Sequence, residues 1–225
     1  MLIAFISDIH ANLIAFDAVL RDIKKYRPDM IICAGDIVGY YPYPNETVER
    51  VVSCGINSIV GNHDRAVVRI NPVGMNRIAA EAILWTAKNI KAEYVDYLRS
   101  LRSRMNTRID ELAVGIYHGS PRDDDEYLYE IDATEELLEM SESWLVVTGH
   151  THIPFVKKMR RGMVINAGSV GQPRDGDPRA SYVLFDSSSR EAWIKRVEYD
   201  VSEVEKKVKE VGLPHFLGER LKYGF

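Results

Sequence analysis

The sequence predicts an α/β protein, because short apolar runs alternate with Gly- or Asp-bearing loops and helical stretches along its first third. Residues 2–6 form the first apolar run, and a helical spacing of apolar residues follows from Leu13 until Pro28 ends it. Two further runs, 30–34 and 56–60, each end in a polar loop. This order of features is typical of βα units.

The middle of the chain is predicted to be helical from about residue 75 to 104, after which apolar runs return. The expected strands cover residues 112–117, 144–148, 163–166, 180–185 and 192–197. The last two flank a polar turn and are predicted to form a hairpin. A charged amphipathic helix is expected at 202–211, ended by Gly212. No linker or repeat interrupts the chain, so we expect one domain over residues 1–225.

The composition is that of an ordinary globular protein, with 46% hydrophobic and 28% charged residues. The N-terminus has no basic leader, and no stretch approaches membrane-spanning length, so we expect no membrane partner. Cys33 and Cys54 are interpreted as free thiols of a reducing cytoplasm. A net charge of -4 disfavours a nucleic acid polymer as the main partner.

Histidines gather in the loops that follow the apolar runs. Five of the six histidines lie there, accompanied by Asp8, Asp36, Asn62 and Asp64. A single histidine beside an apolar run is more often structural than a ligand. Ligands of open α/β sheets bind beyond the carboxyl ends of the strands, where such loops converge. Five histidines placed in this way therefore favour a metal site over a set of unrelated turns.

Five motifs carry a resemblance to a known family: Asp8-Ile9-His10, Gly35-Asp36, Gly61-Asn62-His63-Asp64, His118-Gly119 and Gly149-His150-Thr151-His152. In this order they resemble the calcineurin-like metallophosphoesterases. The stretch 166–174 further resembles the small prokaryotic phosphodiesterases and phosphatases related to diadenosine tetraphosphatases. The strand count and the resemblance both imply a four-layer αββα sandwich of two mixed sheets flanked by helices. The segment 75–104 would then be a cap over the substrate pocket.

The resemblance implies two divalent metal ions and seven ligands. It assigns Asp8, His10, Asp36 and His152 to the first ion, and Asp36, Asn62, His118 and His150 to the second. Mixed N and O ligands suit several metals, and we expect manganese first, with Fe, Zn, Ni, Co or Mg as alternatives. A hydroxide that bridges the two ions would then attack phosphorus in line with the leaving group.

His63 and Asp64 are the expected catalytic side chains beyond the ligands. His63 follows Asn62 directly, so it should reach the rim of the cluster without binding a metal and protonate the departing oxygen. Asp64 is expected to orient the His63 ring and to favour its imidazolium form.

Asn12, Arg122 and Arg174 are candidates for binding the substrate phosphate. Asn12 is also a standard helix N-cap, and each arginine could equally be a solvent-exposed residue. The acidic run 123–126 is interpreted as a solvated loop. The tyrosines at positions 40, 41 and 43 could stack on a substrate ring or pack within their loop.

The predicted function is hydrolysis of a small phosphodiester or phosphomonoester, including nucleotide-like ones. A protein serine/threonine phosphatase is the alternative enzyme, whereas a repair-type nuclease is disfavoured by charge and length. A non-catalytic scaffold is the alternative from another class, because the resemblance extends to a retromer subunit that uses this fold for assembly. A scaffold would tolerate missing ligands, and none is missing here. No oligomeric state is predicted.

Overall fold

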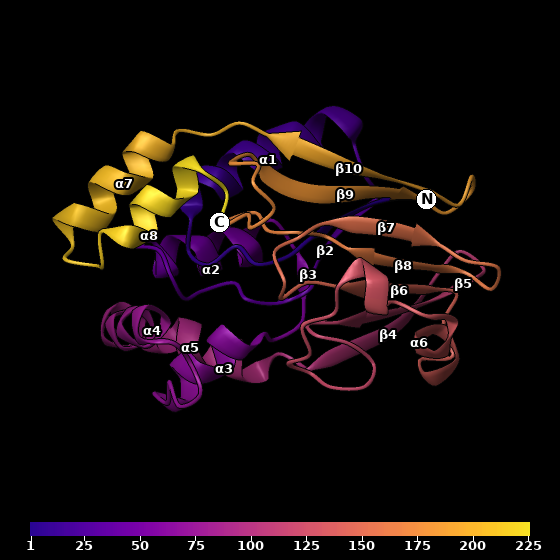
Figure 1. Cartoon of the computed structure of the whole chain (residues 1–225), viewed down its shortest axis with the longest axis horizontal. Helices are drawn as coiled ribbons and strands as arrows, with labels where there is room; N and C mark the ends of the chain where they lie inside the picture. Colours follow the sequence, from indigo (N-terminus) through magenta and orange to yellow (C-terminus); the bar gives the residue numbers. More distant parts are fainter.

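The computed structural model describes all 225 residues and contains two mixed five-stranded sheets (Figure 1). The first sheet has the order β10-β9-β1-β2-β3. Its strands are β1 (Leu2–Ile6), β2 (Met30–Cys33), β3 (Asn57–Ser58), β9 (Ala180–Asp186) and β10 (Glu191–Val197). β1, β2 and β3 are parallel, and the antiparallel hairpin β9–β10 extends the sheet beyond β1.

The second sheet has the order β4-β5-β6-β8-β7. Its strands are β4 (Arg104–Ile109), β5 (Leu112–Tyr117), β6 (Leu145–Thr148), β7 (Phe155–Lys158) and β8 (Met163–Asn166). β5, β6 and β8 are parallel, and antiparallel strands form both edges. The parallel centre of each sheet therefore brings several strand ends to one side of the molecule.

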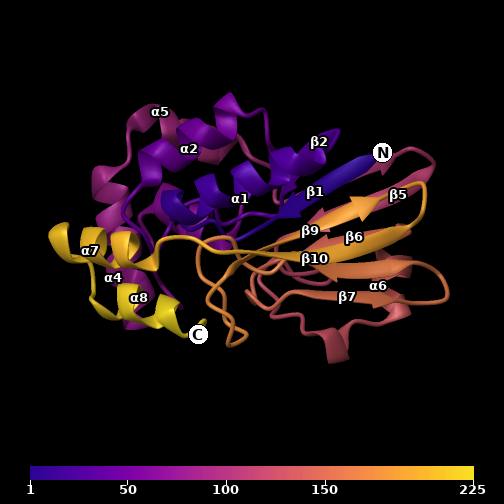
Figure 2. The ribbon, with the colours of Figure 1, turned by 90° about the horizontal axis from the view of Figure 1, so that it is seen from above.

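Eight α-helices surround the sheets, and none is both long and apolar enough to cross a bilayer. They are α1 (Leu13–Tyr26), α2 (Pro44–Ser53), α3 (Asn62–Arg69), α4 (Arg77–Asn89), α5 (Ala92–Ser100), α6 (Glu135–Met140), α7 (Val201–Glu210) and α8 (Phe216–Glu219). Two short 3₁₀ turns lie at Glu130–Asp132 and Arg220–Lys222. Figures 1 and 2 show α4, α5, α7 and α8 gathered at one end of the molecule, with the sheets extending from the other.

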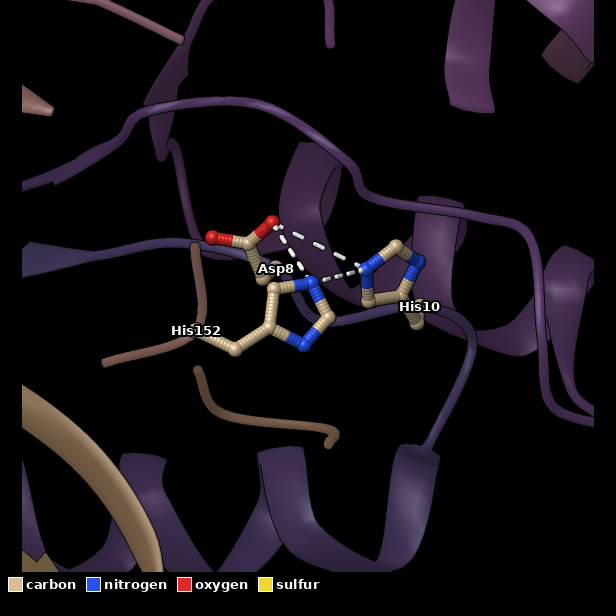
Figure 3. A group of neighbouring side chains, drawn as sticks. All are labelled: Asp8, His10 and His152. Atoms are coloured by element: carbon tan, nitrogen blue, oxygen red, sulfur yellow. Dashed lines mark hydrogen bonds and ion pairs between the residues drawn. The ribbon is translucent and has the colours of Figure 1, made fainter. Parts of the chain in front are cut away.

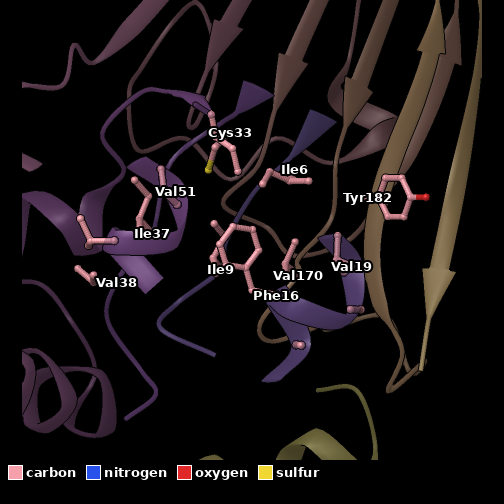
Figure 4. Packing of buried hydrophobic residues seen from close by; sticks show 14 of the residues in the cluster. Ile6, Ile9, Phe16, Val19, Cys33, Ile37, Val38, Val51, Val170 and Tyr182 are labelled. Atoms are coloured by element: carbon pink, nitrogen blue, oxygen red, sulfur yellow. The ribbon is translucent and has the colours of Figure 1, made fainter. Parts of the chain in front are cut away.

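The side-chain alternation of β1 illustrates how the layers are built. Ile3 and Phe5 point into the space between the sheets, where they pack with residues of β6 and β8. Ala4 and Ile6 point the other way and pack against Phe16 and other apolar residues of α1, as Figure 4 shows for Ile6 and Phe16. A strand buried on both faces needs apolar residues throughout, which explains the uninterrupted run. The αββα sandwich predicted from the sequence is confirmed.

Several element predictions are corrected by the structure. Only Asn57–Ser58 of the expected strand 56–60 pairs with β2. The helical segment ends at Ser100, and Arg104 already begins an antiparallel edge strand. Strand β7 and the helices α2, α3 and α6 were not expected. The missed strands lie at sheet edges, where one face meets solvent and no continuous apolar run forms.

Candidate metal centre

Four polar loops and the start of one helix converge where the parallel strands end. Asp8 follows β1, Asp36 follows β2, His118 follows β5, and His150 and His152 follow β6. Asn62 is the first residue of α3, directly after the loop that leaves β3. The ligand atoms of the Asp and His side chains fall into groups within 4.8 Å of one another, and Asn62 Oδ1 lies 3.0 Å from His118 Nε2. The structure thus brings together all seven residues assigned as ligands.

The backbone at these positions adopts an uncommon conformation. Asp8, His10, Asp36, His150 and His152 all have φ between 52° and 64°, the left-handed region that L-residues seldom occupy. Such strain persists only where the surroundings hold it, and it concentrates at functional sites. The loops are held by backbone hydrogen bonds between neighbouring strand ends, including Asp8 N to Gly35 O at 3.0 Å and His10 N to Asp36 O at 2.9 Å.

The first group comprises Asp8, His10 and His152, whose ligand atoms face one another (Figure 3). His10 Nε2 lies 3.0 Å from His152 Nε2, and Asp8 Oδ1 lies 3.2 Å from His152 Nε2 and 3.7 Å from His10 Nε2. Asp8 Oδ1 is buried and accepts no hydrogen bond. Three buried ligand atoms with no other use form a donor set that fits a divalent cation.

The second group comprises Asp36, His118 and His150, with Asn62 beside it. His118 Nε2 lies 3.3 Å from Asp36 Oδ2, 3.1 Å from His150 Nδ1 and 3.0 Å from Asn62 Oδ1. Asp36 Oδ2 also lies 3.6 Å from His10 Nε2 of the first group. One carboxylate oxygen therefore stands between the two groups.

Backbone carbonyls orient two of the histidine rings. His118 Nδ1 lies 2.8 Å from Ala34 O, and His152 Nδ1 lies 2.6 Å from Gln172 O. A carbonyl oxygen only accepts, so each Nδ1 must carry the proton and donate it. The Nε2 atom of each ring then faces the cluster, as in metal-binding histidines generally.

Burial and mutual attraction set the charges of the cluster. Burial by itself would raise the pKa of the Asp8 and Asp36 carboxyls, but neighbouring histidines outweigh it and hold both well below the usual range. Burial lowers the pKa of His152 to about 3 and that of His150 to about 4. Burial by itself would lower the pKa of His118, but the Asp36 carboxylate outweighs it and raises that pKa to about 10. Two ionised carboxylates thus face neutral His150 and His152, whereas His118 carries a second proton that a cation binding at its Nε2 would displace.

His63 lies beside the first group but makes no hydrogen bond through Nδ1. Its ring packs edge-on against His10, with centroids 4.7 Å apart, and against Tyr40 at 4.4 Å. Its ligand atom also forms a group with those of His10 and Asp36. Burial lowers the pKa of His63 well below its ordinary value, so the imidazole is neutral here. The expected imidazolium is therefore not the form that this environment favours.

Asp64 does not contact the His63 ring as expected. Its two oxygens accept hydrogen bonds from the backbone amides of Val38, at 2.9 Å, and Gly61, at 3.0 Å. The second contact caps the N-terminus of α3, and the first ties that helix to the loop after β2. Burial, with repulsion from Asp36, raises the pKa of Asp64 to about 6. The carboxylate positions the helix that carries Asn62 and His63, rather than the ring of His63.

The three candidate phosphate-binding residues differ in position. Asn12 is buried and caps α1 by accepting from Ala15 N at 3.2 Å, the structural alternative considered for it. Arg174 lies next to the cluster, because its backbone N donates to His152 O at 3.2 Å and its guanidinium lies 5.8 Å from the Tyr40 ring.

Arg122 is instead engaged by a neighbour in its own loop. Its guanidinium donates to both carboxylate oxygens of Glu126, at 3.1 and 2.7 Å, and no contact joins it to the cluster. Arg104 likewise pairs with Asp124, and Arg65 with Asp125. The acidic run is thus an ion-paired loop rather than a purely solvated one. Tyr41 is fully buried and donates to Leu217 O at 3.1 Å, so it is not available to stack on a ligand.

A pocket of about 340 Å³ opens beside the second group. It is bounded by α3, by the segment leading into α4 and by the loop after β5, and Asn62 and His150 line its inner end. Arg65 and Tyr127 line it too, and neither belongs to a sequence motif. Arg65 directly follows the motif Gly61-Asn62-His63-Asp64. The direction of its side chain depends on the start of α3 at Asn62, which the motif itself does not specify. A larger groove of about 820 Å³ lies between α1 and α2 and includes no cluster residue.

Comparison with known proteins agrees with this geometry. The calcineurin-like phosphoesterase superfamily domain matches residues 1–190. An uncharacterised protein of Methanocaldococcus jannaschii is 41% identical over an alignment of 241 positions, which covers 99% of this chain and 98% of that protein. The crystal structure of a metallophosphoesterase from Sphaerobacter thermophilus is 37% identical, with a TM-score of 0.87 and full coverage of both chains. A hypothetical protein of Pyrococcus horikoshii, 22% identical, shares the fold with a TM-score of 0.92, over 100% of this chain and 98% of that one.

The chain belongs to the calcineurin-like phosphoesterase superfamily, as its five motifs predicted. It is a metal-dependent phosphoesterase, and its clustered His and Asp side chains provide the site for divalent metal ions.

Proposed function

We propose that this protein hydrolyses small phosphodiesters or phosphomonoesters with two divalent cations, one in each group of ligands. The observation that carries the proposal is the position of Asp36 Oδ2, which lies 3.6 Å from His10 Nε2 and 3.3 Å from His118 Nε2. A carboxylate between two sets of imidazoles can act as a ligand in both cation sites at once. Loss of this one side chain should therefore disturb both sites together.

Asp8, His10, Asp36 and His152 would hold the first cation, and Asp36, Asn62, His118 and His150 the second. Two such cations neutralise phosphate charge and lower the pKa of water, so that the nucleophile forms at neutral pH. The mixture of carboxylate, amide and imidazole donors suits manganese, and Fe, Zn, Ni, Co and Mg remain alternatives. The seven side chains supply two negative charges, which leaves the loaded site positive toward a phosphate.

His63 is the proposed proton donor to the departing oxygen. It lies against His10 at the edge of the first group, and its Nδ1 is free. Because burial keeps the imidazole neutral, the proton must be acquired when the anionic substrate arrives and raises its pKa. Arg174 lies on the same side and can hold a phosphate oxygen through a charge-assisted hydrogen bond.

The pocket supports a small ester over a phosphoprotein or a nucleic acid polymer. Its volume of about 340 Å³ lies at the lower end of small-molecule sites. Of the helical segment 75–104, only Met75 lines this pocket, so its capping role would act through α3, against which α4 and α5 pack. We further propose one domain over residues 1–225 and a cytoplasmic location, which suits two unpaired cysteines.

The test is hydrolysis of p-nitrophenyl phosphate and bis-p-nitrophenyl phosphate by metal-stripped protein titrated with Mn²⁺. We expect turnover to return with metal, and the ratio of the two rates to separate a monoesterase from a diesterase. Asp36→Asn should abolish turnover on both esters, whereas Asp110→Asn, an exposed carboxylate remote from the cluster, should leave it unchanged. Full activity of Asp36→Asn, or metal-independent turnover of the parent protein, would contradict the proposal.

A further inference from the structure

The pocket beside the second ligand group is lined by Tyr127, whose ring pairs with the ligand His150 and with no other aromatic ring. The Tyr127 ring lies 4.1 Å from the His150 ring, at an interplanar angle of 44°, and the residue is 54% exposed. A large ring with half of its surface exposed contributes little hydrophobic free energy to folding. Part of the ring contacts His150, and the exposed part is available to a ligand in the pocket.

The loop that presents Tyr127 is fixed by three ion pairs. Arg65 of α3 pairs with Asp125, Arg104 of β4 with Asp124, and Arg122 with Glu126. Glu126 also accepts from the Ser120 hydroxyl. Two of these ion pairs connect the loop to α3 and to an edge strand, which restrains the backbone that carries Tyr127 before a ligand arrives. A preorganised ring binds with a smaller entropy loss than a mobile one.

Two guanidinium groups line the same pocket. Arg69 has no carboxylate within ion-pair distance, which leaves its charge available. Arg65 pairs with Asp125 through Nη2, but its Nη1 is buried and has no hydrogen-bond acceptor. The pocket thus has two positive charges against the single negative charge of Asp125.

We propose that this pocket binds the part of the substrate that is not attacked, and that this part is a planar aromatic ring joined to a second phosphate, as in a nucleoside diphosphate. The ring would stack on Tyr127, and the second phosphate would contact Arg69 and Arg65. The reacting phosphate would lie at Asn62 and His150, which form the inner end of the pocket. This inference rests on the proposed function, since it assigns the substrate class of the same site.

The test is calorimetric titration of the Mn²⁺-loaded protein with α,β-methylene-ADP, a diphosphate in which carbon replaces the bridging oxygen. Adenosine and methylenediphosphonate are the matched probes without phosphate and without ring. Tyr127→Ala should weaken binding of the methylene-ADP by about 10-fold or more and leave methylenediphosphonate unchanged, because a stacked base contributes about that factor. Tyr127→Phe should retain binding within about 3-fold. Arg69→Gln should weaken both phosphate-bearing probes and reduce the salt dependence of binding.

Two control variants match these changes outside the pocket. Tyr129→Ala removes a tyrosine two positions away that is 43% exposed, and Arg77→Gln removes an exposed arginine of α4; neither should alter any affinity. Equal binding of the methylene-ADP by the parent protein and Tyr127→Ala, or equal affinity for the probes with and without the ring, would overturn the proposal. Hydrolysis of bis-p-nitrophenyl phosphate after metal addition is measured in the same preparation. If that activity is present while the predicted nucleotide binding is not, the substrate class proposed here is wrong and the proposed function stands.

Discussion

Replacing Gly61 by alanine should disable the metal centre by displacing Asp36. Gly61 has φ -95° and ψ -179°, a conformation open to any residue, so the backbone imposes no penalty on alanine. The added Cβ would lie 2.1 Å from Asp36 Oδ1 and 2.4 Å from the Asp36 backbone N. Because Cβ atoms do not approach other heavy atoms closer than 3.0 Å, the carboxylate must retreat by about 0.9 Å.

That displacement is large compared with what a metal site tolerates. Ligand distances in functional sites hold to about ±0.2 Å, and Asp36 is the ligand proposed to serve both cations. We therefore expect Mn²⁺ affinity to fall at least about 100-fold, with turnover lost in parallel. The overpacking itself should destabilise the metal-free protein by about 1–3 kcal/mol, which corresponds to about 2–12 °C in Tm for a chain of this size.

The assay is metal content after equilibrium dialysis against a series of free Mn²⁺ concentrations, alongside thermal unfolding of the metal-free protein. Gly55→Ala is the control, because its φ of +63° strains an alanine while its added Cβ meets nothing within 4 Å. It should lose a similar amount of stability but bind metal normally. Normal metal binding by Gly61→Ala would refute the argument that this glycine sets the position of the bridging carboxylate.

Three further outcomes follow from other parts of the structure. His63→Ala should retain both metals but slow esters with poor leaving groups far more than p-nitrophenyl esters; loss of one metal would instead make His63 a ligand. Cys54, which is exposed, should react with a thiol reagent in the native protein, whereas burial raises the pKa of the Cys33 thiol and should protect it until unfolding. The hydrogen bond from Arg179 lowers the pKa of Asp177 to about 2, below its unfolded value near 3.8, so its contribution is present above about pH 4 and lost as pH falls through 2. Urea unfolding at pH 5 should show Asp177→Asn less stable by at most about 1 kcal/mol, with the difference shrinking at pH 3, because the pair is partly solvated.

The sequence predicted those parts of the fold whose residues are apolar on both faces. β1, β6 and β8 are central strands, and their apolar runs are continuous. β4 alternates exposed and half-buried residues, so the sequence pattern assigned its first residue, Arg104, to the preceding helical segment and predicted no strand over 105–109. Its strand conformation depends on pairing with β5, which a local pattern does not contain.

The site was predicted to a similar depth. The ligand set could be assigned because motif order identified the family, and each motif carries its own ligands. The roles of Asp64 and Arg122 could not, because they depend on contacts across the chain: Asp64 accepts from Val38 N, 26 residues away, and Arg122 pairs with Glu126 within a loop whose shape no motif specifies. Tyr127 was missed for the same reason, since its position over His150 results from folding of that loop.

The central claim is that Asp36 joins two cations into one centre, and electron paramagnetic resonance of the Mn²⁺-loaded protein tests it most directly. Metal analysis should give two Mn²⁺ per chain, and the spectrum should show the exchange coupling of a manganese pair rather than the six lines of isolated ions. Asp36→Asn should remove that coupling. One Mn²⁺ per chain, or two uncoupled ions in the parent protein, would contradict the account.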